Sequence, residues 1–230
     1  MKNTKLILFT FLAITAILFS SCGASSSSDS TSTEKVEGGT ESTESGAVVT
    51  IGTQAWTSKN LDVATYRNGD VIPQVQDASA WASLTTGAWC YYDNDASNGT
   101  KYGKLYNWYA VNDPRGLAPK GFHIPSDAEW TVLTDCLGGA AAAGTKMKSS
   151  SGWYENGNGT NSSGFAGFPG GYRFGGGTFD DVGRGGNWWS ATENNSSDAW
   201  ARCLSYNFGD VFSHYYFNKR DAFSVRCLGD

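Results

Sequence analysis

The stretch GFHIPSDAEWTVL, residues 121–133, gathers the side chains best suited to acid–base chemistry. His123 is followed closely by Asp127 and Glu129, and such residues act as general acids and bases when they share a pocket. The same spacing also begins a helix, because Ser126 and Glu129 form an SxxE capping box whose side chains satisfy free backbone amides. Asp127 suits the first turn, where the helix dipole favours negative charge. We therefore predict a helix start here and no catalytic role.

Other sets of residues that could catalyse a reaction are incomplete. The chain has two histidines, His123 and His214, so it cannot form a three-histidine iron site, and it contains no GxSxG nucleophile elbow. Carboxylates that could serve a glycosidase are too numerous to be specific; they include Asp180, Asp181, Glu193 and Asp210. The sequence therefore predicts no catalytic residue, no metal and no cofactor.

Two further stretches resemble ligand-binding loops only superficially. GGAAAAGTKM, residues 138–147, has Thr145 where a phosphate loop requires lysine, and we interpret it as a linker that ends the helix. DNDASNG, residues 93–99, alternates oxygen-bearing side chains as calcium loops do, but it lacks the bidentate terminal glutamate. We interpret it as a turn between two strands.

Two groups of aromatic residues are candidates for ligand contact. The tryptophan pair 188–189 could stack on sugar rings, although such residues also suit a core. The segment 207–221, NFGDVFSHYYFNKRD, mixes rigid aromatics with small polar residues, as antibody paratopes do. The alternative is an ordinary aromatic hairpin packed on the core. The predicted ligand-binding residues are Phe208, Asp210, Phe212, His214, Tyr215, Tyr216, Asn218, Trp188 and Trp189.

Residues 1–21 have the pattern of an export signal. Lys2 and Lys5 precede an apolar stretch that is too short to span a membrane comfortably. The following LFSSC resembles the bacterial lipoprotein signal, in which the cysteine is diacylated, with Phe19 where leucine is usual. We expect lipidation of Cys22, export, and a lipid anchor in the cell envelope at the outer membrane. The alternative is an ordinary secreted protein with a stray cysteine.

The rest of the chain divides into a tether and one domain. Residues 22–47 are almost wholly Ser, Thr, Gly and Glu, which cannot bury a core and predict a flexible tether. Residues 48–230 contain the aromatic and short apolar segments of a loop-rich, mainly β domain. The net charge of −5 and the lack of a basic stripe argue against nucleic-acid binding.

The domain offers several strands and four cysteines. We predict an opening hairpin around Ile51 and Gly52, and strands within 87–92, 102–110, 199–206 and 223–228. An even number of cysteines in an exported domain is compatible with two disulfides in any of three pairings. These residues are Cys90, Cys136, Cys203 and Cys227.

The order of several motifs resembles one bacterial family. GTQAWTSKNL, GAWCYYDND, YGKLYNWYAVND, GFHIPSDAEWTVL, GFAGFPGGYR, GNWWSATE and FSVRC together look like the Fibrobacter succinogenes major paralogous domain of exported lipoproteins, from about Val48 to the C-terminus. That family is similar to the C-type-lectin-like fold shared with formylglycine-generating enzymes. The resemblance implies an α+β domain with small twisted antiparallel sheets, two helices, long loops and paired terminal strands. Since Ala118 stands where relatives often carry cysteine, it also implies that Cys227 pairs with Cys136 or Cys203.

A codon pattern adds a hypothesis about the aromatic segment. From Ala201 to Phe223, only Lys219 cannot be encoded by an NNC codon, which adenine-directed mutagenesis of AAC codons produces. This resembles the variable regions of diversity-generating retroelement targets. We therefore expect a non-enzymatic envelope lipoprotein whose C-type-lectin-like domain binds a glycan or a protein, with retroelement variation as a further hypothesis. The alternatives are a structural envelope protein without a specific ligand and, less favoured, an enzyme acting on glycan or peptide.

Overall fold

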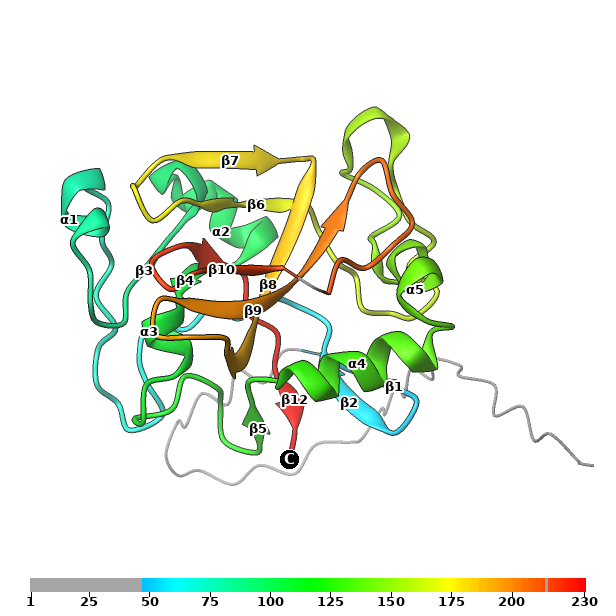
Figure 1. Ribbon diagram of the computed structural model, residues 1–230, viewed down its shortest axis with the longest axis horizontal. Coiled ribbons are helices and arrows are strands. Elements are labelled where there is room, and N and C mark those ends of the chain that lie inside the picture. Colours follow the sequence, from blue (N-terminus) through cyan, green and yellow to red (C-terminus); the bar gives the residue numbers. More distant parts are fainter. Residues whose placement is uncertain (1–46, 214) are drawn as a thin grey trace, which may run out of the picture.

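The computed structural model describes residues 47–213 and 215–230. The expected signal (1–21), the expected lipidation site Cys22, the tether up to residue 46, and His214 lie outside the described residues. The described chain is a mixed α+β domain (Figure 1). Its elements are β1 (Val48–Ile51), β2 (Gln54–Thr57), α1 (Ala78–Ala82), β3 (Trp89–Cys90), η1 (Tyr92–Asn94), α2 (Ala96–Tyr102), β4 (Leu105–Asn107), α3 (Trp108–Val111), β5 (Phe122–His123), α4 (Asp127–Cys136), α5 (Ala140–Met147), η2 (Tyr154–Asn156), β6 (Gly170–Arg173), β7 (Phe179–Val182), β8 (Gly185–Glu193), β9 (Asp198–Ser205), β10 (Tyr216–Asn218), β11 (Ala222–Phe223) and β12 (Leu228–Gly229).

A four-stranded sheet joins the two ends of the domain in the order β1-β2-β12-β5. The predicted opening hairpin is confirmed, and Gly52 takes the positive φ of 63° that its turn requires. Leu228 of β12 lies opposite Trp56 of β2 on one side and His123 of β5 on the other. The two ends of the domain therefore pair through β2 and β12, although the first strand, β1, is not itself a partner of β12; the C-terminus lies beside β5 (Figure 1).

The larger sheet has the order β10-β9-β8-β6-β11-β4-β3, with β7 paired to β6. The strand predicted within 199–206 is confirmed as β9, which pairs along β8. The strand predicted within 102–110 is shorter because the side chain of Asn107 caps α3 by accepting from the Ala110 amide. The strand predicted within 223–228 is split between β11 and β12, which belong to different sheets.

The predicted helix start at Ser126 is confirmed as α4. The Ser126 hydroxyl oxygen accepts from the Glu129 amide at 3.3 Å, and the Glu129 carboxylate accepts from the Ser126 amide at 2.8 Å. Trp130 and Leu133 form its buried face. The described residues contain five α-helices rather than the two that the resemblance implied.

Two segments interpreted as linker and turn contain helices. The interpretation of 138–147 as a linker is wrong for α5, because Gly138 and Gly139 end α4 while the alanines that follow favour a new helix. Within 93–99 the Asp95 side chain accepts from the Ser97 amide and begins α2, so this segment is more than a turn between strands.

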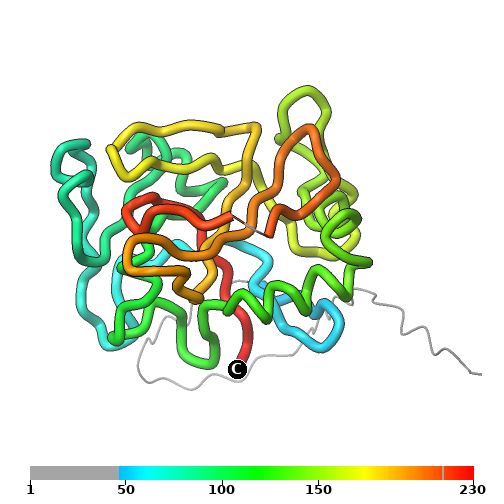
Figure 2. The backbone as a smooth tube through the Cα atoms, in the orientation of Figure 1, coloured from blue at the N-terminus to red at the C-terminus, as the bar shows by residue number. Residues whose placement is uncertain are grey.

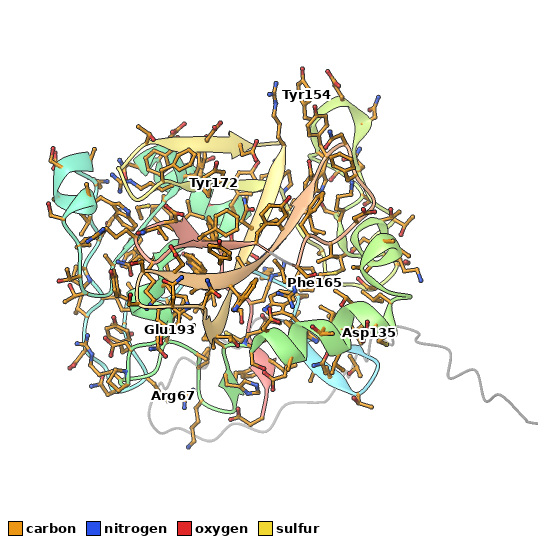
Figure 3. All side chains as sticks on the ribbon, in the orientation of Figure 1. Arg67, Asp135, Tyr154, Phe165, Tyr172 and Glu193 are labelled. Atoms are coloured by element: carbon orange, nitrogen blue, oxygen red, sulfur yellow. The ribbon has the colours of Figure 1, made fainter. Side chains whose placement is uncertain are left out.

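The aromatic core lies on both faces of the larger sheet. Phe165 is fully buried, and its ring contacts those of Trp56, Trp130 and Trp188 within 6.0 Å (Figure 3). On the other face, Trp189 stacks on Phe223 with ring centroids 4.3 Å apart. One cluster contains both Val49, near the start of the described chain, and Leu228, near its end, so both ends contribute to the same core.

The expected pair of disulfides does not form in this structure. Cys90, Cys203 and Cys227 have free thiols, so the implied pairing of Cys227 with Cys136 or Cys203 is wrong. Cys90 packs in one core cluster with Trp81, whereas Cys227 packs in another. Burial raises the pKa of all three thiols to about 12.

Among the described residues, no helix is long and apolar enough to cross a membrane.

Candidate ligand-binding surface

Exposed aromatic rings gather between β9 and β10. Phe208, Tyr215 and Tyr216 are 50%, 54% and 55% exposed, and Phe212 and Phe217 are half-buried. We call residues 207–213 and 215–217 the aromatic loop. Figures 1 and 2 show this orange-to-red segment running beside α5. Of the alternative, an aromatic hairpin packed on the core, only the contact of Phe217 with the buried Phe223 is present, while Phe208, Tyr215 and Tyr216 remain exposed.

The rings of the aromatic loop touch one another in series. Ring centroids lie 5.5 Å apart between Phe208 and Phe212, and 5.9 Å apart between Phe212 and Tyr215. Tyr215 lies 6.4 Å from Phe217, which packs edge-on against the buried Phe223 at 4.9 Å. The exposed rings therefore form a continuous surface that is anchored to the core at one end.

Backbone hydrogen bonds hold the aromatic loop on α5. The Val211 amide donates to the Ala140 carbonyl at 2.8 Å, and the Thr145 amide donates to the Gly209 carbonyl at 3.0 Å. The buried Lys148 ammonium donates to the Phe208 carbonyl at 2.9 Å, and burial lowers the pKa of this lysine. Because these contacts fix the main chain, the rings are presented with little conformational freedom to lose on binding.

A hollow of about 620 Å³ opens between the aromatic loop and the start of α5. Its lining residues are Ala140, Ala141, Asp210, Val211, Phe212, Ser213 and Tyr215. Among the described residues, the Asp210 carboxylate has no hydrogen-bond or ion-pair partner. Two rings beside a carboxylate and a hydroxyl can bind an amphipathic ligand by stacking and hydrogen bonding.

Two further predicted ligand-binding residues, Tyr216 and Asn218, lie in β10 and have different surroundings. Tyr216 lies opposite Trp200 of β9, and their rings are 5.8 Å apart, on the other side of the strand from Phe217. Trp200 was not proposed as a surface residue in the sequence analysis. A signal was present, because in the strand Trp200 stands between the small residues 199 and 201, which predicts that its side chain points to the opposite face from theirs. The Asn218 side-chain oxygen accepts from the Arg220 amide at 3.1 Å, so this residue shapes the turn after β10.

Trp188 and Trp189 are not part of any exposed surface, and the prediction that they bind a ligand is wrong. Both are fully buried on β8, facing opposite sides of the sheet. The Trp188 indole donates to the Asn60 side-chain oxygen at 2.9 Å, and the Trp189 indole donates to the Tyr106 carbonyl at 2.8 Å. Their rings and polar atoms are therefore used within the core.

The family comparison covers nearly all of the described chain. The model of the Fibrobacter succinogenes major domain matches residues 49–228. The chain belongs to this family. No curated protein matches it.

This Fibrobacter major domain does bring together the acid–base residues near α4. His123 lies with Nε2 3.0 Å from Glu129 Oε1 and Nδ1 2.9 Å from Asp230 Oδ1. Burial lowers the pKa of His123, but the hydrogen bonds that its ring N–H groups donate to the two carboxylates outweigh burial and leave this pKa raised. Because Glu129 is also occupied by the Ser126 amide and hydroxyl, the cluster ties the C-terminus to the helix start.

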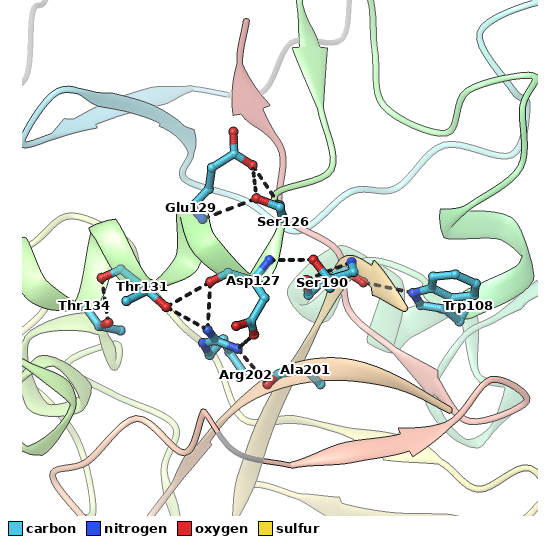
Figure 4. Close-up of polar contacts among 10 residues, drawn as sticks. Trp108, Ser126, Asp127, Glu129, Thr131, Thr134, Ser190, Ala201 and Arg202 are labelled. Carbon is cyan, nitrogen blue, oxygen red and sulfur yellow. Dashed lines mark hydrogen bonds and ion pairs between the residues drawn. The ribbon is translucent and has the colours of Figure 1, made fainter. Parts of the chain in front are cut away.

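Asp127 joins α4 to the sheet in the same domain. Its carboxylate pairs with the buried Arg202 of β9, and its carbonyl accepts from the same guanidinium at 3.0 Å (Figure 4). The Thr131 hydroxyl oxygen also accepts from Arg202, at 3.3 Å. The side chains of His123, Ser126, Asp127 and Glu129 thus all have partners that position α4.

Proposed function

We propose that this chain is a non-enzymatic, lipid-anchored binding protein of the bacterial cell envelope, with the aromatic loop as its contact surface. The observation that carries the proposal is the continuous row of rings at Phe208, Phe212 and Tyr215, of which the two outer ones are half-exposed. Exposed aromatic surface is costly to leave in water and marks interaction sites when it is contiguous. The ligand is a glycan or a protein, since both offer apolar faces with polar rims.

The composition of this surface supports binding over a purely structural role. A structural envelope protein would bury these rings, whereas Phe208 and Tyr215 are half-exposed and Tyr215 lines a hollow together with Phe212. Asp210 and Ser213 supply polar groups beside the rings, as in paratopes that combine large contact area with adaptable hydrogen bonds. An enzyme acting on glycan or peptide is the less favoured alternative.

The finer parts of the proposal rest on the sequence. The mixed α+β domain and the paired terminal strands are compatible with a C-type-lectin-like fold. Lipidation of Cys22 and a tether of residues 22–47 would hold the domain at the outer membrane without a spanning helix.

If a retroelement generates sequence variation in this domain, burial restricts the positions that can vary to a short segment. Ala201, Arg202 and Leu204 are buried at the start of the NNC-compatible segment, and 219 and 221–223 are buried at its end. Among the described residues between these ends, 205–210, 212–213 and 215–218 are at least partly exposed and could vary without disturbing the core, whereas Val211 is buried in it. An imperfect repeat of this part of the gene beside a reverse transcriptase is the expected genomic sign.

Binding to a broad glycan array and a panel of extracellular proteins tests the proposal. The purified full-length protein is measured beside Phe208→Ala and Tyr215→Ala variants, with and without EDTA. Loss of one ring from the contact surface should weaken binding by about tenfold or more. EDTA should have no effect.

Phe174→Ala is the matched control, because Phe174 is 41% exposed and lies outside the aromatic loop. It should bind as the wild type does. If the wild type bound nothing in the panel, or if all three folded variants bound equally well, the aromatic loop would not be the contact surface.

A further inference from the structure

A second hollow, of about 750 Å³, lies on a different part of the domain. It is formed by residues 57–63, which follow β2, and by 99–103 at the end of α2. None of its lining residues lines the hollow at the aromatic loop. Its apolar walls are Leu61, Val63, Pro119, Phe122 and Phe168. Its volume is within the range typical of small-molecule sites.

Positive charge dominates the lining of this hollow. Lys59, Lys101 and Arg226 contribute to it, and Asp62 is its only carboxylate. Asp62 is neutralised by Lys104, whose ammonium lies 2.5 Å from it. Within the described residues, the three cations of the lining form no ion pair. A local excess of cations stands out on a chain whose net charge is −5.

Arg226 provides a fixed charge at the wall. It is 1% exposed, and its guanidinium donates to four neutral oxygens at 2.6–3.0 Å. Those oxygens belong to Asn60, Thr57, Phe165 and Ala166. Neutral acceptors solvate the cation without cancelling its charge, whereas buried charges are usually paired. Burial lowers the pKa of Arg226 to about 9, which leaves it protonated at neutral pH.

Lys59 and Lys101 add two positive charges at the solvent-exposed rim of the hollow. Lys59 and Lys101 are exposed, and they reach the hollow from the two segments that face each other across it. These segments approach closely at Gly103, where an added Cβ would lie 2.9 Å from the Leu61 carbonyl oxygen. The ammonium groups can therefore approach a bound anion while Arg226 raises the potential beneath it.

We propose that this hollow binds a small organic molecule that carries a carboxylate and an apolar face. The carboxylate contacts Lys59 and Lys101, and the apolar face packs on Phe122 and Phe168. Sugar acids and acylated acidic amino acids share this chemistry. The site is independent of the aromatic loop and adds a second ligand class to the protein.

Calorimetric titration of the full-length protein with glucuronate, N-acetylglutamate and glucose tests the proposal. At least one carboxylate should bind while neutral glucose does not, and the two carboxylates distinguish the sugar from the amino-acid source. The affinity should fall as salt is raised, because the rim lysines are screened by ions. Lys59→Glu and Lys101→Glu should each weaken binding by about tenfold.

Arg184→Glu is the charge-matched control, since Arg184 is exposed and does not line the hollow. It should retain the wild-type affinity, and so should Tyr215→Ala, which separates this site from the aromatic loop. All these positions are exposed, and circular dichroism checks that each variant folds. The proposal is overturned if neither carboxylate binds, if inorganic phosphate competes equally well, or if Arg184→Glu weakens binding as much as the lysine changes.

Discussion

Asp221 is a carboxylate that the fold buries without a cation beside it. It is 8% exposed, and one of its oxygens accepts from the Gly175 amide at 2.7 Å. Burial raises the pKa of Asp221 to about 6, although hydrogen bonds from the Gly175 and Asn218 backbone work in the opposite direction. The native state therefore holds this proton more tightly than the unfolded chain, whose aspartate pKa is about 4.

Asp221→Asn should remove a pH-dependent loss of stability. Because the folded pKa is raised, the wild type is most stable below pH 4 with respect to this group and loses stability as the pH rises to about 6. Asparagine keeps the acceptor for Gly175 without the charge. The free energy of unfolding in urea should match the wild type near pH 4 and exceed it by about 2–3 kcal/mol at pH 7, because each unit of pKa difference corresponds to about 1.4 kcal/mol.

Asp135→Asn is the control, since Asp135 is exposed on α4. The difference in the free energy of unfolding between Asp135→Asn and the wild type should not grow between pH 4 and 7 as the difference for Asp221→Asn does. The raised pKa of His123 is common to all three proteins, so its titration cancels in the differences. A constant difference between Asp221→Asn and the wild type across this pH range would contradict the prediction.

At the scale of single residues, some roles could be predicted from the sequence and others could not. The capping roles of Ser126 and Glu129 were predictable because both partners lie within one turn. The burial of Arg202 and Arg226 was not, since their partners lie 60 or more residues away in sequence. The tryptophan pair at 188–189 shows the same limit, because an exposed and a buried indole look alike in sequence.

At the scale of elements, α5 carries the aromatic loop. Gly144 allows this approach, because an added Cβ would lie 2.4 Å from the Asp210 carbonyl oxygen and 2.5 Å from that of Gly209. Real Cβ atoms are not found so close to backbone oxygens, so any larger residue must push the loop away. The absence of a side chain at Gly144 therefore sets how closely the aromatic loop can pack on α5, and with it the position of the contact surface.

Gly144→Ala should displace the aromatic loop while α5 itself persists. Alanine favours the helix by about 0.5–1 kcal/mol, yet the clash falls on rigid backbone and should outweigh that gain. Hydrogen exchange should accelerate at the Thr145 and Val211 amides, which bond across the contact. This readout needs no ligand, so it tests the architecture separately from binding.

Gly176→Ala is the matched control, because nothing lies within 4 Å of the Cβ it would add. Its amide exchange should match the wild type at both positions. Unchanged protection of Thr145 and Val211 in Gly144→Ala would show that the loop does not depend on this close approach.

Elements with local signals were predicted well, and those defined by distant partners were not. The opening hairpin and α4 have their turn and cap residues within a few positions. The split of 223–228 between two sheets has no local sign, because FSVRCL contains no glycine, proline or turn motif where the chain changes partners. The strand β10 within the segment 207–221 was not predicted, because its pairing with β9 is not visible in the local sequence.

On the scale of the whole molecule, the last strand connects elements from far apart in sequence. In the smaller sheet β12 lies between β2 and β5, so these two strands are joined only through the C-terminus. Leu228 is buried between Trp56 and His123, and the Asp230 amide donates to the Gly121 carbonyl at 3.1 Å. The domain can therefore close only after its final residues are available.

Removing residues 228–230 should abolish much of the domain's stability. The loss of the buried Leu228 alone should cost about 2–5 kcal/mol, and a domain of this kind has about 5–15 kcal/mol in total. Removing Asp230 alone is the control and should cost less than about 1 kcal/mol, because its ion pair with His123 is exposed. Urea unfolding followed by tryptophan fluorescence measures both. If the protein lacking residues 228–230 unfolded at the same urea concentration as the wild type, the stability of the domain would not depend on β12. The core to which both ends contribute would then be stable without the strand that joins β2 to β5.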